Sequence, residues 1–221
     1  YQCDVDTVGT DSLVADAENV AVCYDVYDAL GLTSEACGLE LKLNSRKVLH
    51  GMLEICGVAE ERGGQVLTIL DKLDKIGEDG VEEELRKAAA EWTEAGRDES
   101  VDAVIGFMNW TTTIDAADID AVLGALGEKL AKSERGTAGV AELREVFGHL
   151  DTLGVPREFL RLDVTLSRGL DYYTGPIYEF TITGLGKFGS LGGGGRYDDL
   201  MSLYGMDVPA TGVCIGLSRV Q

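Results

Sequence analysis

The chain has 221 residues, 45% of them hydrophobic, which is enough for one good core with a smaller unit beside it. Its formal net charge of −20 argues against broad non-specific binding to nucleic acid, although a local basic site is not excluded. No apolar run approaches the ~18 residues of a membrane helix.

The amino-terminal residues resemble the interior of a domain. YQCDVDTVGT has no initiator Met, no basic cluster and no signal-like apolar core. Gln2 to Val8 alternates weakly between polar and apolar residues, which predicts a strand. We therefore expect the chain to be a fragment of a longer cytoplasmic protein that does not associate with membranes.

The cysteines and histidines do not indicate a metal centre. The five cysteines are odd in number, none forms a CxxC pair, and most lie among Val, Leu and Ile. This pattern favours small core residues in a reducing compartment over zinc ligands or disulfides. His50 and His149 have no ligand partner near them in the sequence, so we interpret both as structural and expect no metal site.

Residues 1–57 predict the first part of a core built from strands and helices. Asp16 is expected to cap the first helix, and Asn44 or Ser45 the second. The expected elements are a strand over 2–8, a helix over 17–30, a strand over 39–43 and a helix over 46–56.

Residues 58–153 differ from the rest in having successive acid-rich segments with helical character. These segments are ILDKLDKIG, GVEEELRKAAAEW, DIDAVLGALGEKLAKS and GVAELREVFGHLDTLG. We expect a separate helical domain over 58–153, inserted between two parts of the core, whose charge runs are solvated helix faces.

Residues 154–221 return to a period of two. Apolar and polar residues alternate over 160–167, which predicts a strand, and a second strand is expected over 178–182. LGKFGSLGGGGRYDDL predicts a turn, a glycine run and the start of a helix, and GVCIGLSRV predicts a buried strand that leads into a turn or helix. The strands on the two sides of the helical segment are expected to share one antiparallel sheet, so the predicted fold class is α+β.

Two segments concentrate groups that could bind a small ligand. In SRGLDYYTGPIYEF, the guanidinium of Arg168 can fork onto a carboxylate or phosphate, and the tyrosines offer flat walls with hydroxyl tips. An ordinary hairpin with an outward-facing arginine explains this segment equally well. In GSLGGGGRYDDL, four consecutive glycines permit close approach of a ligand to the backbone, but flexible hairpin loops have the same composition.

Polar groups also occur on the strands at the two ends of the chain. Gln2, Asp4 and Asp6 are two residues apart and share one face of a strand, where they either meet a cationic partner or face water. GVCIGLSRV ends in Arg219, whose side chain could simply reach solvent. Together the four segments place polar groups and glycines on one sheet, which suits a small zwitterion bound beside a polyphosphate.

The same segments resemble the signature sequences of one family. RGLDYYTG resembles the signature loop of histidyl-tRNA synthetases, and GGGRYDDL resembles their second, glycine-rich signature. ATGVCIGLSRV resembles motif 3 of class II aminoacyl-tRNA synthetases, and YQCDVDTVG resembles the strand that ends motif 2. The match in RGLDYYTG is the specific one, and the resemblance is weakest over the acidic helical segment, where the family carries an insertion domain.

The resemblance implies roles for particular residues. Arg168 would meet the histidine carboxylate and the α-phosphate of ATP, and Asp6 would face the amino group of the substrate. The other implied contacts are Gln2 on the histidine-site strand, Tyr173 and Tyr197 as walls of the histidine pocket, Gly193, Gly194 and Gly195 as a glycine-rich wall, and Arg219 against ATP.

The implied reaction is activation of histidine by ATP to histidyl-adenylate, followed by transfer to the 3′ end of tRNA(His). Mg²⁺ would accompany ATP, and no tightly bound cofactor is expected. The family is homodimeric through motif 1. Motif 1, the motif 2 arginine and the anticodon-binding domain are not in this chain, so the fragment alone is expected to be inactive. Ser218 and Asp199 depart from the family pattern, which often has an acid and a glycine there.

Two rival interpretations remain open at the level of sequence. One is a synthetase paralogue that has lost catalysis and senses histidine, like the regulatory subunit of ATP phosphoribosyltransferase. The other is a pseudo-synthetase domain that acts only in protein interaction. Arg219 and the long helical segment argue against the first, and the intact RGLDYYTG argues against the second.

Overall fold

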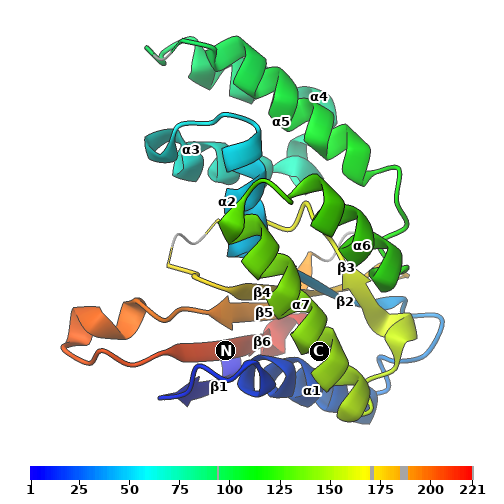
Figure 1. Cartoon of the computed structure of the whole chain (residues 1–221). Helices are drawn as coiled ribbons and strands as arrows, with labels where there is room; N and C mark the ends of the chain where they lie inside the picture. The colour runs from blue at the N-terminus through cyan, green and yellow to red at the C-terminus, as the bar shows by residue number, and fades with distance from the viewer. Residues whose placement is uncertain (94, 170–171, 185–188, 221) are drawn as a thin grey trace.

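The computed structural model describes residues 1–93, 95–169, 172–184 and 189–220, except the side chain of Asp74. Strands from the beginning and the end of the chain lie side by side, with helices around them (Figure 1). In chain order the elements are β1 (Gln2–Val8), α1 (Leu13–Ala29), β2 (Leu39–Ser45), α2 (Arg46–Ile55), α3 (Glu60–Leu70), α4 (Leu73–Ala89), α5 (Arg97–Thr111), α6 (Ile119–Lys129), α7 (Glu134–Thr152), β3 (Leu160–Leu162), β4 (Pro176–Ile182), β5 (Ser190–Arg196), β6 (Ala210–Gly216) and α8 (Leu217–Val220), with 3₁₀ turns at Arg157–Phe159 and Leu200–Tyr204.

The strands of the described residues form one six-stranded sheet in the order β1-β6-β5-β4-β2-β3. The α+β class and the sharing of one sheet by the two ends of the chain are confirmed. The sheet is not wholly antiparallel, however, because β2 and β3 pair in parallel. A parallel pair requires a long crossover, and the whole helical segment from α2 to α7 provides it.

The strand predicted over 160–167 is too long, because β3 ends at Leu162. The carboxylate of Asp163 accepts hydrogen bonds from the backbone N and the Oγ1 of Thr165, at 3.0 and 2.6 Å. The backbone N of Leu166 donates to the carbonyl of Asp163 at 3.1 Å. An aspartate that bonds to the backbone two residues onward is typical of a turn, so the alternating pattern continues into a turn rather than a strand.

The structure places the glycine run within a strand. Gly192, Gly193, Gly194 and Gly195 all lie within β5, an inner strand of the sheet that is flanked by β4 and β6. Glycines weaken a strand interior and often mark close approach of another group. Their position on an inner strand therefore indicates that other groups approach the backbone of β5 too closely for side chains at these positions.

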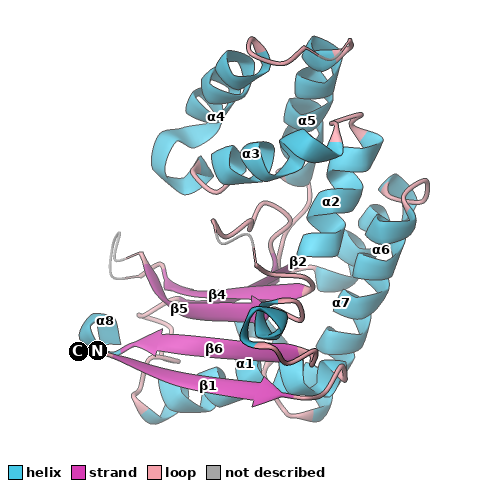
Figure 2. Ribbon diagram, turned by 90° about the vertical axis from the view of Figure 1, so that its left-hand side faces the viewer, coloured by secondary structure: helices cyan, strands magenta, loops and turns pink. Residues whose placement is uncertain are grey.

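Helices cover the opposite sides of this sheet unequally. α1 packs against β6 and α7, and α7 packs against β2 and β4, so these two helices form a layer on one face. α3, α4 and α5 lie at one end of the molecule, farther from the sheet than α1 and α7 (Figure 2). Residues 58–153 carry helices α3–α7, and their independence as a domain remains a prediction. No helix within the described parts of the chain combines the length and apolar character needed to cross a membrane.

A buried charge network fixes the layer of α1 to the back of the sheet. Asp16 is fully buried, and its Oδ1 accepts hydrogen bonds from Tyr178 Oη at 2.7 Å and from Thr211 Oγ1 at 3.0 Å. Its Oδ2 accepts from Arg196 Nε at 3.0 Å. Asp16 is therefore not the helix cap that the sequence predicted. α1 begins earlier, at Leu13, and Asp16 lies inside it facing strands β4, β5 and β6.

We predict that Gly194→Ala destabilises the chain by about 3 kcal/mol, because overpacking against rigid neighbours costs energy of this order. A Cβ atom at this position would lie 1.9 Å from the carbonyl oxygen of Gly212, which belongs to the backbone and cannot rotate away. Urea denaturation measures the free energy of unfolding. Gly148→Ala is the control, since Gly148 lies exposed on α7 with nothing near its Cβ position, and it should stabilise by ~0.5–1 kcal/mol. Equal effects of the two substitutions would contradict the prediction.

Candidate functional site

One face of the sheet, which we call the site face, lies opposite the layer of α1 and α7. It carries Asp6 on β1, Gly212 on β6, and Gly193 and Gly195 on β5. Asp6 pairs with Gly212 across β1 and β6, and Gly212 pairs with Gly195 across β6 and β5. Residues paired in this way share one face of a sheet, so these positions form a row of minimal side-chain volume next to a carboxylate.

The glycines of β5 make room for two residues of the RGLDYYTG segment. A Cβ atom on Gly193 would lie 2.1 Å from Arg168 Nη1, and one on Gly195 would lie 2.8 Å from Tyr173 Cδ1. Neither distance is compatible with a side chain at the glycine position. Gly193 and Gly195 therefore leave open the space that the arginine and the tyrosine occupy.

Gly212 has the same relation to Asp6 and Tyr197. The phenol of Tyr197 donates a hydrogen bond to Asp6 Oδ1. A Cβ atom on Gly212 would lie 1.8 Å from that oxygen and 3.0 Å from the phenol oxygen. Burial first, and then the bond to Asp6, raises the pKa of Tyr197 well above its usual value, so the phenol remains a donor at neutral pH.

Aromatic rings connect the Asp6–Tyr197 pair to Arg168. The ring of Tyr172 lies 6.1 Å from that of Tyr197 and 4.7 Å from that of Tyr173, measured between centroids. The guanidinium carbon of Arg168 lies 5.9 Å from the ring centroid of Tyr173. Burial raises the pKa of Tyr173, which keeps this phenol neutral beside the arginine. Leu170 and Asp171 of this segment lie outside the described residues.

Arg168 combines an unusual backbone with unused hydrogen-bonding capacity. Its φ of 51° lies in the left-handed region, which residues other than glycine rarely adopt. Its Nη1 donates to the carbonyl of Tyr178 at 3.0 Å and lies 4.0 Å from Glu179 Oε1. Its Nε is buried and has no hydrogen-bond partner among the described residues. The side chain can therefore donate a further hydrogen bond to an oxygen atom of a ligand.

Gln2 and Arg219, both predicted site residues, lie away from this group. Gln2 Nε2 donates to Asp4 Oδ2 at 3.1 Å, and the Cys214 thiol approaches Gln2 Oε1 at 3.6 Å. Arg219 donates to the backbone carbonyl of Ser190, at the other end of β5. In the described structure no hydrogen bond or ion pair joins either residue to Arg168, Tyr173 or Tyr197.

Gly194, predicted as part of the glycine-rich wall, faces away from the site face. It pairs with Tyr178 and Val213, whose side chains are buried in the core on the α1 side. Alternation along the strand therefore leaves Gly193 and Gly195 on the site face and directs Gly194 to the back. Glycine is needed here so that β5 can pack against the neighbouring strand, because a Cβ atom on Gly194 would clash with the carbonyl oxygen of Gly212.

A cavity of about 850 Å³ lies beside Ser167, the residue before Arg168, on the side of the helical segment. The sheet contributes Lys42, Glu179 and Thr181, the connection from α3 to α4 contributes Asp71, and α4 contributes Lys75. Its lining is mixed in charge and includes hydroxyl groups, so it could hold a polar ligand. Within the described residues, no group of three or more His, Cys, Asp or Glu side chains is placed to hold a metal ion.

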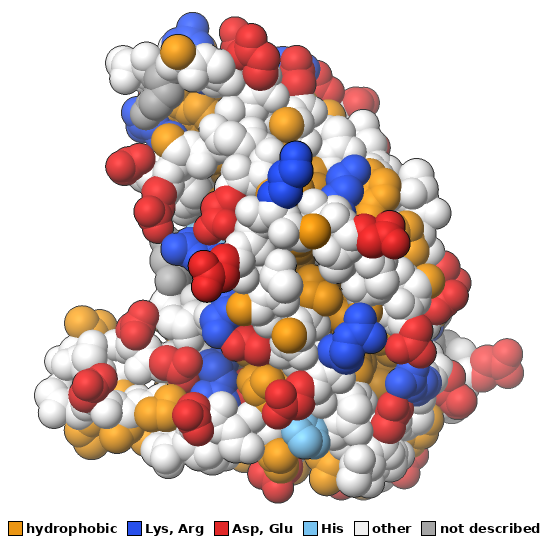
Figure 3. Space-filling model, viewed as in Figure 1, with side chains coloured by type: hydrophobic (Ala, Val, Ile, Leu, Met, Phe, Trp, Pro, Cys, Tyr) orange, Lys and Arg blue, Asp and Glu red, His pale blue; other side chains and the backbone are white. Residues whose placement is uncertain are grey.

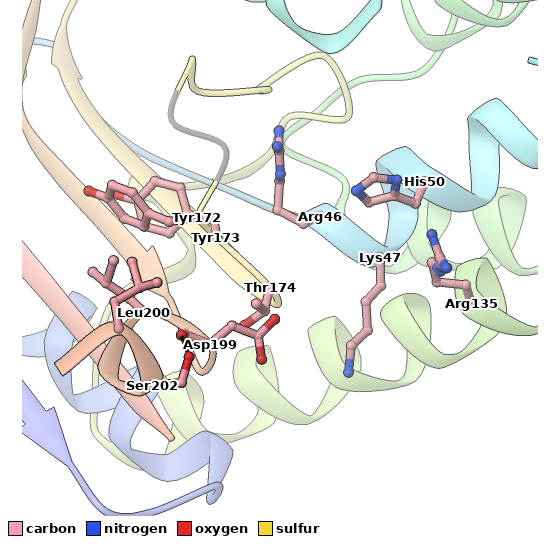
Figure 4. Close-up of a pocket in the computed structure, with 11 residues that line it drawn as sticks. Arg46, Lys47, His50, Arg135, Tyr172, Tyr173, Thr174, Asp199, Leu200 and Ser202 are labelled. Carbon is pink, nitrogen blue, oxygen red and sulfur yellow. Dashed lines mark hydrogen bonds between the residues drawn. The ribbon is translucent and has the colours of Figure 1, made fainter. Parts of the chain in front are cut away.

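A second cavity, of about 580 Å³, lies between α2, α7 and the tyrosines (Figure 4). Its lining includes Arg46, Lys47, His50 and Arg135, and Lys and Arg side chains border a hollow on the corresponding side of the surface (Figure 3). Lys47 already pairs with Glu142, and Arg135 lies 3.5 Å from Glu54 and 3.4 Å from Glu60. The charges of Lys47 and Arg135 are therefore balanced by acidic side chains of the same chain.

Sequence reasoning missed several residues that shape the site. Gly212 and Glu179 lie on the site face. Both alternate along their strands with buried residues, and this alternation is the sequence signal that could have placed them there. Asn44 and Arg46 are buried side chains that bond to the segment before Arg168. The sequence predicts Asn44 or Ser45 as a helix cap, and the cap is Ser45, whose Oγ accepts a hydrogen bond from the backbone N of Lys47.

The six-stranded sheet with its flanking helices is the catalytic-core fold of a class II aminoacyl-tRNA synthetase. The crystal structure of histidyl-tRNA synthetase from Nostoc sp. PCC 7120 is similar to 99% of this chain, with a TM-score of 0.82 and 33% sequence identity, over 49% of that protein. The sequence model of the family described as histidyl-tRNA synthetase matches residues 1–220. The chain therefore belongs to the histidyl-tRNA synthetase family.

Individual relatives agree with this assignment. A histidine–tRNA ligase of Stenotrophomonas maltophilia is 42% identical over 224 residues, and one of Ruegeria pomeroyi is 38% identical over 236 residues. The alignments cover 100% of this chain and 46% of each relative, so the chain spans about half the length of these curated relatives. A structure named ATP phosphoribosyltransferase regulatory subunit/histidyl-tRNA synthetase, from Bacillus halodurans, shares the fold with a TM-score of 0.74 at 23% identity.

We predict that His50 makes the stability of the chain depend on pH. Burial first, and then the cations Arg46 and Arg135, lowers the pKa of His50, while Glu54 and Glu60 oppose the shift. The folded state thus favours neutral His50, and its contribution to stability is present above the unfolded pKa of ~6.5 and lost as pH falls through the lowered folded value.

Urea denaturation between about pH 7.5 and 5.5 measures this effect. His50→Gln should flatten the decline in the free energy of unfolding, whereas Lys132→Gln, at an exposed position between α6 and α7, should retain the slope of the unmodified chain. An unchanged slope in His50→Gln would show that other groups cause the decline.

Proposed function

We propose that this chain is the histidine-activating part of a histidine–tRNA ligase. The observation that supports this most directly is the joint placement of Arg168, Tyr173 and the Asp6–Tyr197 pair over glycines of the site face. These residues offer a cation and a carboxylate on one open surface, as a zwitterionic amino acid requires. Membership of the histidyl-tRNA synthetase family supports histidine as that amino acid.

In the proposed first step, Asp6 binds the amino group of histidine and Arg168 binds its carboxylate. A carboxylate oxygen attacks the α-phosphorus of ATP, the bond to the bridging oxygen breaks, and pyrophosphate leaves with that bonding pair. The products are histidyl-adenylate and pyrophosphate. The chain contributes by alignment and by cationic stabilisation of phosphate charge, for which the free Nε of Arg168 is available.

In the proposed second step, a ribose hydroxyl at the 3′ end of tRNA(His) attacks the activated carbonyl, and AMP leaves. Tyr173 and Tyr197 would line the histidine pocket, with Gln2 on the same strand as Asp6. Arg219 would contact ATP, for which it must exchange its present bond to the Ser190 carbonyl. Mg²⁺ would enter with the phosphates of ATP.

The proposal extends to the whole protein. The relatives are about twice as long as this chain, and the remaining half would supply motif 1, the motif 2 arginine and the anticodon-binding domain. We infer a homodimer formed through motif 1, and a cytoplasmic site of action, where tRNA is charged. Gln2, Asp4 and Asp6 are exposed here, which agrees with a site that other segments complete.

A second candidate is a histidine-binding paralogue without ligase activity, of the ATP phosphoribosyltransferase regulatory type or a pseudo-synthetase interaction domain. This candidate is considered because the Bacillus halodurans protein, whose name includes that regulatory subunit, has the same fold. It predicts histidine binding without ATP-dependent chemistry. ATP–pyrophosphate exchange by the full-length protein separates the two candidates.

We predict that Arg168→Ala in the full-length protein lowers the rate of adenylate formation about a hundredfold or more, because a cation aimed at developing phosphate charge contributes ~3 kcal/mol. Arg168→Lys should not restore the rate fully, since an ammonium cannot fork between a carboxylate and a phosphate. Single-turnover adenylate formation is the measurement. An unchanged rate in Arg168→Ala would remove this residue from the mechanism.

We further predict that the 221-residue chain alone binds histidine weakly and shows no measurable exchange. Asp6→Asn should weaken histidine binding at least tenfold in calorimetry, because an amide does not balance the ammonium charge. Asp25→Asn, at an exposed position on α1, is the matched control and should bind as the unmodified chain does. Equal binding by Asp6→Asn would place the amino group elsewhere, and strong exchange by the chain alone would show that its own residues complete the ATP site.

A further inference from the structure

The backbone of Arg168 must be held in place by its surroundings. Its φ of 51° is sparsely populated for any residue other than glycine, and such conformations persist when neighbouring interactions enforce them. The guanidinium also has to lie in the narrow space above Gly193. The interactions of residues 163–167, which lead into Arg168, therefore determine where this side chain points.

Asn44, at the end of β2, holds two carbonyl groups of that segment. It is fully buried, and its Nδ2 donates to the carbonyls of Val164 and Leu166 at 3.0 and 2.9 Å. These are alternate residues of one turn, so a single amide fixes the curvature of the chain just before Arg168. A buried carbonyl that lost this donor would have to seek another one, which requires the turn to move.

Arg46 and Ser167 secure the next residue. Arg46 is 4% exposed, and its Nη1 donates to the carbonyl of Ser167 at 3.3 Å. Ser167 is 2% exposed, and its Oγ donates to the carbonyl of Leu67 on α3 at 2.8 Å. Both the backbone and the side chain of the residue preceding Arg168 are thus tied to neighbouring helices.

We propose that Asn44, Arg46 and Ser167 are positioning residues that hold Arg168 in its left-handed conformation over the site face. The inference deepens the proposed function and rests on it where catalysis is concerned. None of the three side chains needs to touch a substrate, because each acts through the carbonyls that precede Arg168. Ser167 also connects α3, the first helix after residue 58, to the proposed catalytic arginine.

Kinetics in the full-length protein test the catalytic part. Asn44→Ala should lower the rate of ATP–pyrophosphate exchange about a hundredfold, because small misplacements of a catalytic group cost that much, and Ser167→Ala about tenfold. Ser100→Ala is the matched control, since Ser100 is another buried serine that donates to a distant carbonyl, that of Gly57 at 2.9 Å. It should leave the rate within about twofold.

A double-mutant cycle separates positioning from general destabilisation. If Asn44 and Ser167 act through Arg168, their substitution should cause no further loss of rate in an Arg168→Ala background. An equal loss of rate in the unmodified protein and in the Arg168→Ala variant would overturn the proposal. So would the absence of any loss of rate in the unmodified protein.

Trypsin provides a readout that does not depend on activity. In the 221-residue chain, Asn44→Ala and Ser167→Ala should raise the rate of cleavage after Arg168 about tenfold relative to cleavage after Lys132, because release of the turn lets the segment enter a protease site. Unchanged cleavage would overturn the positioning role. If the full-length protein lacked exchange altogether, the proposed function would fail, while the cleavage rates would still decide whether these side chains hold Arg168.

Discussion

The buried ion pair between Asp16 and Arg196 is the interaction on which the rest of the structure depends. A strand rich in glycine has few side chains with which to anchor itself, and β5 leaves its site face empty so that Arg168 and Tyr173 can occupy that space. The strand must therefore be fixed from behind. Asp16 does this by accepting bonds from three inner strands at once, through Tyr178, Arg196 and Thr211. Burying these charges is costly, and complete pairing offsets that cost.

Much of the fold could be predicted from the sequence, because periodicity reports burial directly. The alternation in β1, β2 and β4 and the helix over 46–56 all follow from local pattern, and the cap at Ser45 was one of two open choices. The pattern could not give the direction of β3, because parallel and antiparallel neighbours look alike in sequence. Nor could it distinguish a capping aspartate from one inside a helix that pairs with an arginine 180 residues later.

The candidate site was only partly accessible to such reasoning. Family resemblance selected Arg168, Tyr173, Tyr197 and Asp6, and the structure places these over one row of glycines, although their roles in binding stay predictions. The glycine run could not be assigned to a strand or to a loop from the sequence, because composition gives flexibility but not location. The sequence does not predict Asn44 as a partner of the segment before Arg168, because Asn44 and its acceptor Val164 are 120 residues apart in the chain. The bond also depends on a turn at a place where alternating residues predict a strand.

The neighbouring ends of β1 and β6 give the chain an unusual freedom of connectivity. Gln2 pairs with Gly216, and the backbone N of Leu217 donates to the carbonyl of Tyr1 at 3.1 Å. A few added residues could therefore join these two points, and new chain ends could be made between the exposed residues Ala131 and Lys132, which lie between α6 and α7. Circular permutation of this kind changes the order of the elements without breaking a strand pair. The structure of the sheet thus depends on which strands are neighbours and not on the order of the strands along the chain.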